Sequence, residues 1–255
     1  MPLLEVDNLS IQFGGLKEVN KVSFAIEDGE LMGLIGPNGA GKTTVFNLIT
    51  GHYQPTSGDI RFESKSLVSV DPAEITKRGV ARTFQNIRLF GNLTVLDNVR
   101  IAFHCRVRHS LFDALLRMPA FRTEEREITE KAQELLELFH LTHRQDELAG
   151  SLPYGEQRRL EIARALATKP RLLLLDEPAA GMNPAEVQTL MELIRFIRKR
   201  FGLTILLIEH QMKVVMGICE RIVVMDFGEV LAMGSPSEIQ SNPKVIEAYL
   251  GKEVV

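Results

Sequence analysis

The sequence predicts an α/β fold with a parallel-rich sheet, an N-terminal antiparallel β subdomain and an inserted helical subdomain. Residues 31–35, 172–175 and 204–208 are short apolar runs, typical of strands buried on both faces. Predicted helices separate these runs, and such alternation favours a parallel sheet covered by helices. With 255 residues, the chain has room for one large domain or for a domain with a subdomain.

The N-terminal part predicts two kinds of β-structure. Apolar residues alternate along residues 4–13 and 22–26, which is typical of half-buried strands, and residues 58–62 predict an edge strand. The buried strand at 31–35 leads into a glycine-rich turn. A helix is expected over residues 42–50, with Gly51 as its C-cap.

The middle of the chain predicts helices. Thr94 and Asp97 form a capping box, and Ile128, Ala132, Leu135, Leu136 and Phe139 mark the buried stripe of another helix. Residues 104–123 are rich in arginine and show no clear period. We therefore expect a helical subdomain at residues 86–165, inserted into a core with its β subdomain at 1–85 and 166–255.

The last third alternates between helices and strands again. A helix is expected over residues 158–168, and Asn183, Pro184 and Glu186 predict the capped start of another. Residues 222–226 and 229–233 flank Phe227 and Gly228, which predicts a hairpin. Two short closing helices are expected to begin at Ser235-Pro236 and Asn242-Pro243.

Composition excludes several classes of function. The 30 basic and 33 acidic residues leave a net charge of −3, which argues against a nucleic-acid partner. Cys105 and Cys219 form no C-x-x-C pair, so we expect two reduced, packed thiols rather than a zinc or redox site. We see no signal peptide, and the apolar runs are too short for a membrane helix, so any membrane role would need partner subunits.

A glycine-rich loop carries the firmest functional signal. Residues 36–43, which are Gly36, Pro37, Asn38, Gly39, Ala40, Gly41, Lys42 and Thr43, match G-x-x-x-x-G-K-[ST] between a predicted strand and a helix. The glycines allow backbone N–H groups to surround a phosphate, and the helix N-terminus adds a positive dipole. We expect Lys42 to reach the β- and γ-phosphates of ATP and the Thr43 hydroxyl to bind Mg²⁺. The alternative is a chance glycine turn.

Acidic residues follow a second buried strand. Asp176 and Glu177 end the run at 172–175, where Asp176 would orient the Mg²⁺ shell and Glu177 would act as general base for the attacking water. Two solvated acids at a strand end are the alternative. His210 ends the next strand and could contact the γ-phosphate, although a lone histidine is more often structural.

The motif at residues 152–157 indicates a family. Leu-Pro-Tyr-Gly-Glu-Gln, followed by an expected helix and lying upstream of Asp176, resembles the signature of ABC ATPases, L-S-G-G-Q. Phe13, the glycine loop, Gln85, this motif, the acidic pair and His210 occur in the order of that family. GTPases would need an N-K-x-D element, which the sequence lacks. The chain thus resembles the ATP-binding subunit of an ABC transporter, with a P-loop NTPase core.

The resemblance implies roles for individual residues. Phe13 would stack on adenine, with a core aromatic beside a turn as the alternative, and Gln85 would sense Mg²⁺ and water. The implied catalytic residues are Glu177, His210 and Gln85, and the implied Mg²⁺ ligands are Thr43, Gln85 and Asp176. Nucleotide contacts are implied for Phe13, residues 36–43, Thr44 and Asp176 and, in the signature, for Tyr154, Gly155 and Glu156. Two copies would face each other head to tail, with each ATP between one glycine loop and the other copy's signature.

The sequence departs from the family pattern at three positions. Pro153 replaces the signature serine and has no donor, and Tyr154 replaces a glycine. The contact across the dimer is therefore expected to depend on Gly155, backbone N–H groups and the helix dipole. Asn183 stands where an aspartate is usual, and its role as an N-cap is an adequate explanation.

In these departures the sequence resembles the larger ATPase subunit of branched-chain amino acid importers. It resembles that subunit also in the run Ala81-Arg82-Thr83-Phe84-Gln85 and in the ending Ala248-Tyr249-Leu250-Gly251. The segment 104–123 also fits that subunit. The resemblance implies a second ABC ATPase, identical or a sister chain, two membrane permeases, and indirectly a periplasmic or extracellular binding protein. The chain would lie at the cytoplasmic face of the membrane. Alternatives are a transporter for another solute, an ABC protein acting on ribosomes or DNA ends, and a non-catalytic ATP-binding scaffold.

Overall fold

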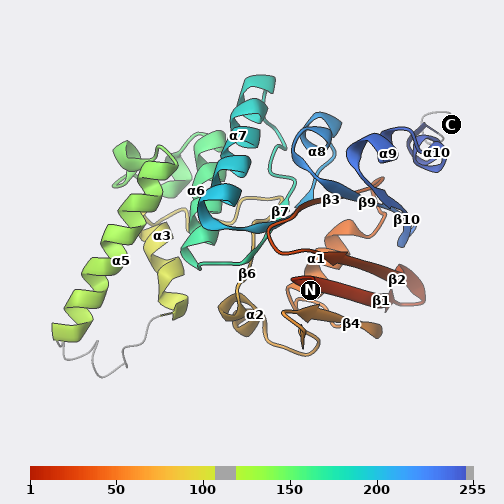
Figure 1. Ribbon diagram of the computed structural model, residues 1–255. Helices are drawn as coiled ribbons and strands as arrows, with labels where there is room; N and C mark the ends of the chain where they lie inside the picture. The colour runs from red at the N-terminus through yellow and green to blue at the C-terminus, as the bar shows by residue number, and fades with distance from the viewer. Residues whose placement is uncertain (107–118, 251–255) are drawn as a thin grey trace. The chain divides into compact units, whose positions relative to one another are not determined.

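The computed structural model describes residues 1–106 and 119–250 (Figure 1). The chain divides into two compact units, and each is described by itself. One contains residues 1–85 and 171–255, and the other contains residues 86–170. Most of the predicted segment 104–123 lies outside the described residues.

An antiparallel sheet forms the N-terminal part of the first unit. Its order is β2-β1-β4-β5, with β1 (Leu4–Phe13), β2 (Leu16–Ile26), β4 (Ser57–Phe62) and β5 (Lys65–Ser66). The expected N-terminal antiparallel structure is confirmed. The expectation that residues 58–62 form an edge strand is wrong, because β5 pairs with the outer side of β4. Glu63 and Ser64 both adopt positive φ, which turns the chain back after β4.

The second sheet is mostly parallel, as the apolar runs predict. Its order is β10-β9-β3-β8-β7-β6, and only the pairing of β10 with β9 is antiparallel. Every residue of β3, β8 and β7 is buried. Since parallel strands share one direction, their carboxyl ends meet at one edge of the sheet. The strands are β3 (Leu31–Ile35), β6 (Val80–Arg82), β7 (Leu172–Asp176), β8 (Thr204–Ile208), β9 (Arg221–Asp226) and β10 (Glu229–Gly234).

The helix α1 (Lys42–Ile49) lies between the two sheets (Figure 1). One apolar core joins Leu4 and Ile26 of the antiparallel sheet, Phe46 of α1, and Met32 and Leu34 of the parallel sheet. Thr50 follows the helix, and Gly51 has the left-handed conformation that ends it. The glycine loop is therefore fixed between a buried strand and a buried helix.

Two helices cover the opposite face of the parallel sheet (Figure 1). α7 (Pro184–Phe201) begins with the predicted capping box of Asn183 and Glu186, which is confirmed. α8 (Met212–Ile218) and the residue after it pack so closely on β3 that a Cβ atom on Gly33 would lie 3.1 Å from the Cys219 sulfur. Cys219 is free and buried, and burial raises the pKa of its thiol to about 12. Cys105 is only partly buried.

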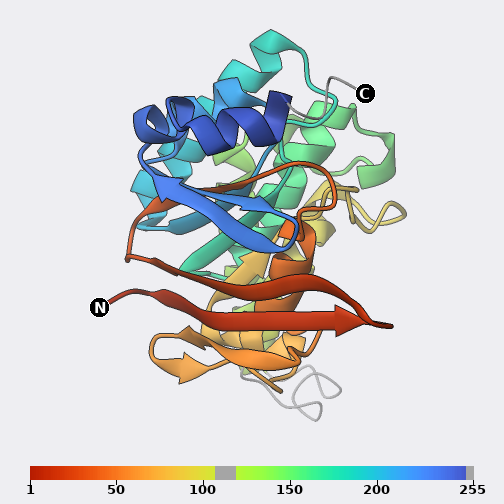
Figure 2. The same cartoon turned by 90° about the vertical axis from the view of Figure 1, so that its right-hand side faces the viewer.

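The C-terminal part of this unit contains the hairpin of β9 and β10 and two short helices that lie beside it (Figure 2). The hairpin of β9 and β10 turns at Phe227 and Gly228, as predicted, and the Asn20 amide donates a hydrogen bond to the Gly228 carbonyl at 2.8 Å. The remaining helices of this unit are α2 (Pro72–Arg78), α9 (Pro236–Gln240) and α10 (Pro243–Leu250).

The second unit is helical in the part that the structure describes. Thr94 caps α3 by accepting a hydrogen bond from the Asp97 amide. The predicted capping box is only half formed, because the Asp97 carboxylate accepts from Arg100 instead. The stripe predicted from Ile128 to Phe139 is buried. The helix predicted at 158–168 begins four residues earlier, at Tyr154, because Pro153 already serves as its N-cap. The described helices are α3 (Val95–Phe103), α5 (Pro119–Leu138) and α6 (Tyr154–Ala167), and 3₁₀ turns lie at His104–Arg106, Thr142–Arg144 and Ala149–Ser151.

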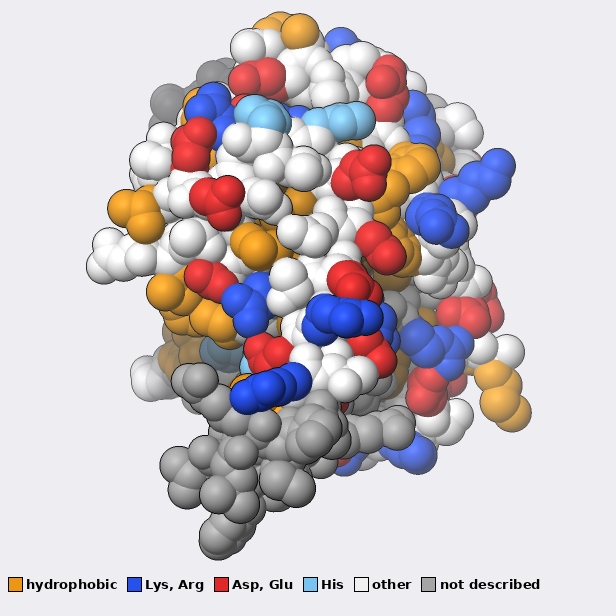
Figure 3. Space-filling model, turned by 90° about the vertical axis from the view of Figure 1, so that its left-hand side faces the viewer, with side chains coloured by type: hydrophobic (Ala, Val, Ile, Leu, Met, Phe, Trp, Pro, Cys, Tyr) orange, Lys and Arg blue, Asp and Glu red, His pale blue; other side chains and the backbone are white. Residues whose placement is uncertain are grey.

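The surface of the helical unit mixes charges of both signs (Figure 3). Arg126 pairs with Glu130, and Lys131 pairs with Glu127, along the exposed side of α5. This interspersed pattern agrees with the absence of a basic surplus in the sequence. None of the described helices combines the length and the apolar character that crossing a bilayer requires.

Candidate functional site

The glycine loop follows β3 and can be built only with glycine at two of its turns. Gly36 has φ 150° and Gly41 has φ 91°. A Cβ atom on Gly36 would lie 2.1 Å from the Met225 carbonyl oxygen, and one on Gly41 would lie 2.6 Å from the Glu18 carbonyl oxygen. Gly39 has φ 80°. The loop is a backbone cradle at the N-terminus of α1, which suits an anion.

The side chains beside the loop point in different directions. The Lys42 ammonium donates to the carbonyl oxygens of Gly36 (2.7 Å) and Pro37 (2.9 Å), so its side chain folds over the loop. Thr43 is exposed. The Thr44 hydroxyl is instead buried and donates to the Glu18 carboxylate at 2.6 Å, toward β2. Lys42 and Thr43 are therefore at the loop, whereas the Thr44 side chain faces away from it.

The C-terminal helix reaches the start of the loop. The Tyr249 hydroxyl of α10 is hydrogen-bonded to the Gly36 backbone, and burial raises the pKa of that hydroxyl to about 12. Met225 of β9 lies against the same glycine. Gly36 is thus fixed from two sides by Met225 and Tyr249, both of which lie far later in the chain.

We expect Gly36→Ala to lower the free energy of unfolding by about 3 kcal/mol or more, because overpacking against the Met225 carbonyl adds to backbone strain. Gly202→Ala is the matched control. Gly202 also has positive φ, at 62°, but a Cβ there would meet nothing within 4 Å, so only about 1 kcal/mol of strain is expected. Urea unfolding measures both variants, and equal losses would contradict the close-contact argument.

Asp176, at the end of β7, is held by an arginine from the neighbouring strand. Arg82 of β6 donates to the Asp176 carboxylate at 2.7 Å and to the Asn47 side chain of α1 at 2.7 Å. Both charged side chains are almost fully buried. The Arg82 guanidinium also lies 4.9 Å from the centre of the Phe84 ring. Arg82 therefore connects the end of β7, the helix α1 and the residue that precedes Gln85.

Two of the predicted catalytic residues, Gln85 and His210, both contact the third, Glu177. Gln85 Nε2 donates to one carboxylate oxygen at 2.9 Å, and His210 Nε2 lies 2.7 Å from the other. The Glu177 backbone has φ 47°, an uncommon conformation for this residue type. The structure thus brings Gln85, Glu177 and His210 together at the carboxyl edge of the parallel sheet, which also carries the glycine loop.

A second carboxylate, that of Glu209, binds the backbone next to Glu177 and His210. Glu209 is 2% exposed and accepts backbone hydrogen bonds from Ala179 (2.7 Å), His210 (3.1 Å) and Gln211 (3.3 Å). Burial raises the pKa of the Glu209 carboxyl, whereas these bonds oppose the rise. Glu209 therefore fixes the loop after Glu177 and the backbone of His210.

The aromatic residue predicted to stack on adenine is accessible. Phe13 ends β1 and is 42% exposed, and its ring lies 5.3 Å from that of Tyr53 in an edge-to-face arrangement. An exposed aromatic pair of this kind offers a face to a planar ligand. Phe13 belongs to the same unit as the glycine loop.

The signature residues belong to the helical unit. Tyr154, Gly155 and Glu156 form the first turn of α6, and no side chain caps the helix at Pro153. Glu156 lies beside Arg144 at 3.4 Å and Arg159 at 3.7 Å. Their predicted contact with nucleotide concerns a second copy and remains a prediction.

Sequence reasoning missed Arg82 and Glu209 as supports of the site. Arg82 is a charge at the end of an otherwise apolar strand, three residues before Gln85, and Glu209 is a second acid beside His210. A charged residue at the end of a buried strand was the available signal in both cases. Their partners come from other strands and could not be assigned from local pattern.

The residues fit Mg²⁺ bound together with phosphate. Mg²⁺ usually keeps several waters and takes few protein ligands, so no full protein cage is expected. Among the described residues no group of three or more His, Cys, Asp or Glu side chains could hold a metal alone. The exposed Thr43 and the carboxylate of Asp176 are oxygen donors of the hard type that Mg²⁺ prefers, beside a cradle that a Cβ atom would fill.

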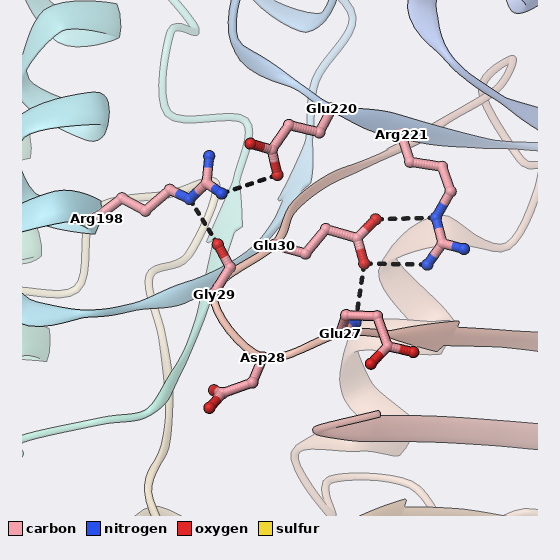
Figure 4. A pocket seen from close by; sticks show the side chains of 7 residues that line it. All are labelled: Glu27, Asp28, Gly29, Glu30, Arg198, Glu220 and Arg221. Carbon is pink, nitrogen blue, oxygen red and sulfur yellow. Dashed lines mark hydrogen bonds and ion pairs between the residues drawn. The ribbon is translucent and has the colours of Figure 1, made fainter. Parts of the chain in front are cut away.

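A polar pocket of about 510 Å³ lies near the opposite edge of the parallel sheet (Figure 4). Its lining residues come from the connection between β2 and β3 (residues 27–30), from the last turn of α7 (Arg198) and from the start of β9 (Glu220 and Arg221). Arg198 binds Glu220 at 2.8 Å, and Arg221 binds Glu30 at 2.9 Å, so these arginines are engaged by protein carboxylates. The lining includes neither Glu177 nor any residue of the glycine loop.

Comparisons with known proteins agree with this geometry. The pattern of the ABC transporter family matches residues 19–180, and that of the branched-chain amino acid ATP-binding cassette transporter matches residues 229–255. The chain is 49% identical to the high-affinity branched-chain amino acid transport ATP-binding protein BraF of Pseudomonas aeruginosa, covering 98% of each chain. It is also 49% identical to LivG of Escherichia coli strain K12, of the same description, with the same coverage.

A solved structure has the same fold. The ADP conformation of an ATP-binding cassette of an ABC transporter is 34% identical, with a TM-score of 0.85 over 98% of this chain and 99% of that one. The family pattern and the identities together settle the family that the sequence indicated. The chain belongs to the ABC transporter ATP-binding family.

Proposed function

We propose that this chain is the ATP-hydrolysing subunit of an importer for branched-chain amino acids. The observation that carries the enzymatic part is the placement of Glu177 between Gln85 and His210, on the sheet edge that also carries the glycine loop. A carboxylate fixed by two partners is pre-organised to accept a proton from water. The relatives BraF and LivG are named as ATP-binding proteins of branched-chain amino acid transport.

Each residue would have a distinct role in hydrolysis. The loop amides and Lys42 would bind the phosphates, and Phe13 would bind the base. Thr43, Gln85 and Asp176 would hold Mg²⁺, directly or through water, and Mg²⁺ when bound neutralises charge on the phosphates. Glu177 would take the proton of the attacking water, and His210 would orient Glu177 and approach the γ-phosphate.

The active form would contain two ATPase subunits, either identical or sister chains. One solved relative, 25% identical with a TM-score of 0.77, is a dimeric ATP-binding cassette in a post-hydrolysis state bound to ADP and Pi. It supports a dimer here, with Gly155 and its neighbours facing the nucleotide of the other subunit. Closure of the two subunits on ATP and release after hydrolysis would drive the transport cycle.

Membrane subunits would complete the transporter. The described helices include none suited to crossing a bilayer, so passage of the solute would require two permease subunits. The chain would then be peripheral, at the cytoplasmic face of the membrane, and a periplasmic or extracellular binding protein would act indirectly. We propose no nucleic-acid partner.

Uptake of labelled leucine, isoleucine and valine tests the solute. A strain without this gene should lose high-affinity uptake of these amino acids, and the wild-type gene should restore it. A gene carrying Glu177→Gln should not, because the permeases alone have no source of energy. Unchanged uptake in the deleted strain would contradict the solute and would favour an ABC ATPase for another solute.

A further inference from the structure

The first turn of α6 lacks the side chain that would ordinarily fix it. Pro153 is the N-cap and makes no side-chain hydrogen bond. The amides of Glu156 and Gln157 donate to the Pro153 carbonyl, both at 2.9 Å. A proline has no hydroxyl with which to cap a helix or to bind a phosphate.

Tyr154 is tied into the helix through its hydroxyl. Arg158, one turn later, donates from Nη2 to the Tyr154 hydroxyl at 3.0 Å, and its guanidinium lies 5.7 Å from the centre of the tyrosine ring. Tyr154 as a whole is 44% exposed. The hydroxyl is therefore held from inside the unit, while part of the ring remains at the surface of the first turn.

The arginine is itself fixed by a buried carboxylate. Arg158 is fully buried and Glu161 is 1% exposed, and they form an ion pair at 2.8 Å. Burying two charges costs more than burying apolar groups of similar size. Such a pair is a poor way to gain stability alone, whereas it fixes one orientation of the guanidinium and so of the tyrosine.

The same carboxylate binds the chain that follows Gln85. The Arg88 amide donates to the second oxygen of Glu161 at 3.3 Å. Arg88 lies three residues after Gln85 in the sequence. One connected set of hydrogen bonds thus runs from the Arg88 backbone through Glu161 and Arg158 to the Tyr154 hydroxyl.

We propose that Tyr154 is a positioning residue, whose hydroxyl, held by the buried Arg158–Glu161 pair, sets the first turn of α6 in the conformation that hydrolysis requires. The pair holds the tyrosine side chain at the first turn, where Pro153 offers no side-chain hydrogen bond. This inference rests on the proposed function, since it concerns the ATP site completed by a second subunit. It assigns no contact between the Tyr154 hydroxyl and the nucleotide.

Two conservative variants and one control test the inference. Tyr154→Phe keeps the ring and removes the acceptor of Arg158. Glu161→Gln keeps the shape and removes the charge that fixes Arg158. Glu134→Gln, on the exposed side of α5 in the same unit, is the matched control. Three quantities are measured on the full chain: the melting temperature, the affinity for ATP at protein concentrations too low for dimers, and phosphate release with Mg²⁺ over a range of protein concentrations.

We expect Tyr154→Phe to lower kcat about tenfold, the size typical of one lost hydrogen bond to a charged group. The ATP affinity of the glycine loop should stay within twofold, because that loop lies in the other unit of the chain. Glu161→Gln should lower kcat as well, and the double variant should lose no more than the worse single variant, since both act through Arg158. The control should match the wild type.

Three results would overturn the inference. Unchanged kcat in Tyr154→Phe removes the positioning role. A fall in melting temperature with kcat unchanged per folded molecule shows that the pair only stabilises the unit. Additive losses in the double variant show that the two residues act separately. Absence of phosphate release from the wild type would overturn the proposed function as well, and so is distinguishable from the first three.

Discussion

Glu177→Gln should bind ATP with near-normal affinity and release phosphate about 10²- to 10⁴-fold more slowly than the wild type, the range typical of a lost general base. Glutamine has the same shape and retains an oxygen for the hydrogen bond from Gln85, which lies 2.9 Å from the carboxylate. It cannot take a proton from water. Titration with a fluorescent ATP analogue and single-turnover phosphate release separate binding from chemistry.

The control for this variant is Glu192→Gln, on the exposed side of α7. It makes the same chemical change at a distance from the strand ends and should leave both quantities unchanged. Near-normal turnover in Glu177→Gln would remove Glu177 as the base. His210→Ala adds a second comparison, because His210 lies 2.7 Å from the carboxylate and its loss should leave Glu177 less well oriented.

Lys42→Ala should weaken ATP binding by about 100-fold or more, the effect of losing a buried charge-assisted contact with phosphate. The lysine also donates to the Gly36 and Pro37 carbonyls, so the empty loop loses two internal bonds. Isothermal titration measures the affinity. Melting in the absence of nucleotide shows how much of the loss comes from the loop itself.

Lys199→Ala, on the exposed side of α7, is the matched control and should bind ATP normally. Undiminished affinity in Lys42→Ala would count against the role of the glycine loop. Retained affinity with a lower melting temperature would show that Lys42 serves the loop and not the nucleotide.

Local patterns predicted those parts of the molecule that local chemistry determines. The buried strands, the glycine loop before α1 and the capping box at Asn183 follow from neighbouring residues alone. Because the fold class and the family depend on such local patterns, both could be predicted, and both predictions are confirmed. The grouping of the site residues was also foreseeable, because parallel strands end at one edge of their sheet.

Other features depend on residues distant in sequence. The pairing of Arg82 with Asp176 follows from the register of β6 beside β7, where Arg82 is level with Leu174. The hydrogen bond between Tyr249 and Gly36 joins the ends of the first unit. The two-residue strand β5 is too short to give a periodic pattern, which is why the sequence predicted β4 as an edge strand. None of these partners is encoded in a local window.

The signature at residues 152–157 shows a further limit of prediction from sequence. The sequence identified Pro153 and Tyr154 as departures, but it could not show that Arg158 and Glu161, further along the same helix, accommodate them. A resemblance describes the residues that a family shares. The network around Tyr154 became evident only when side chains four and three residues apart could be placed on one helix.

Phosphate release by the assembled transporter at saturating ATP and Mg²⁺ tests the central claim most directly. The account predicts steady turnover that stops when Mg²⁺ is chelated and falls at least about 100-fold with Glu177→Gln. Tight ATP binding without any phosphate release from the wild-type assembly would contradict it, and would make the chain a scaffold that uses ATP only to dimerise.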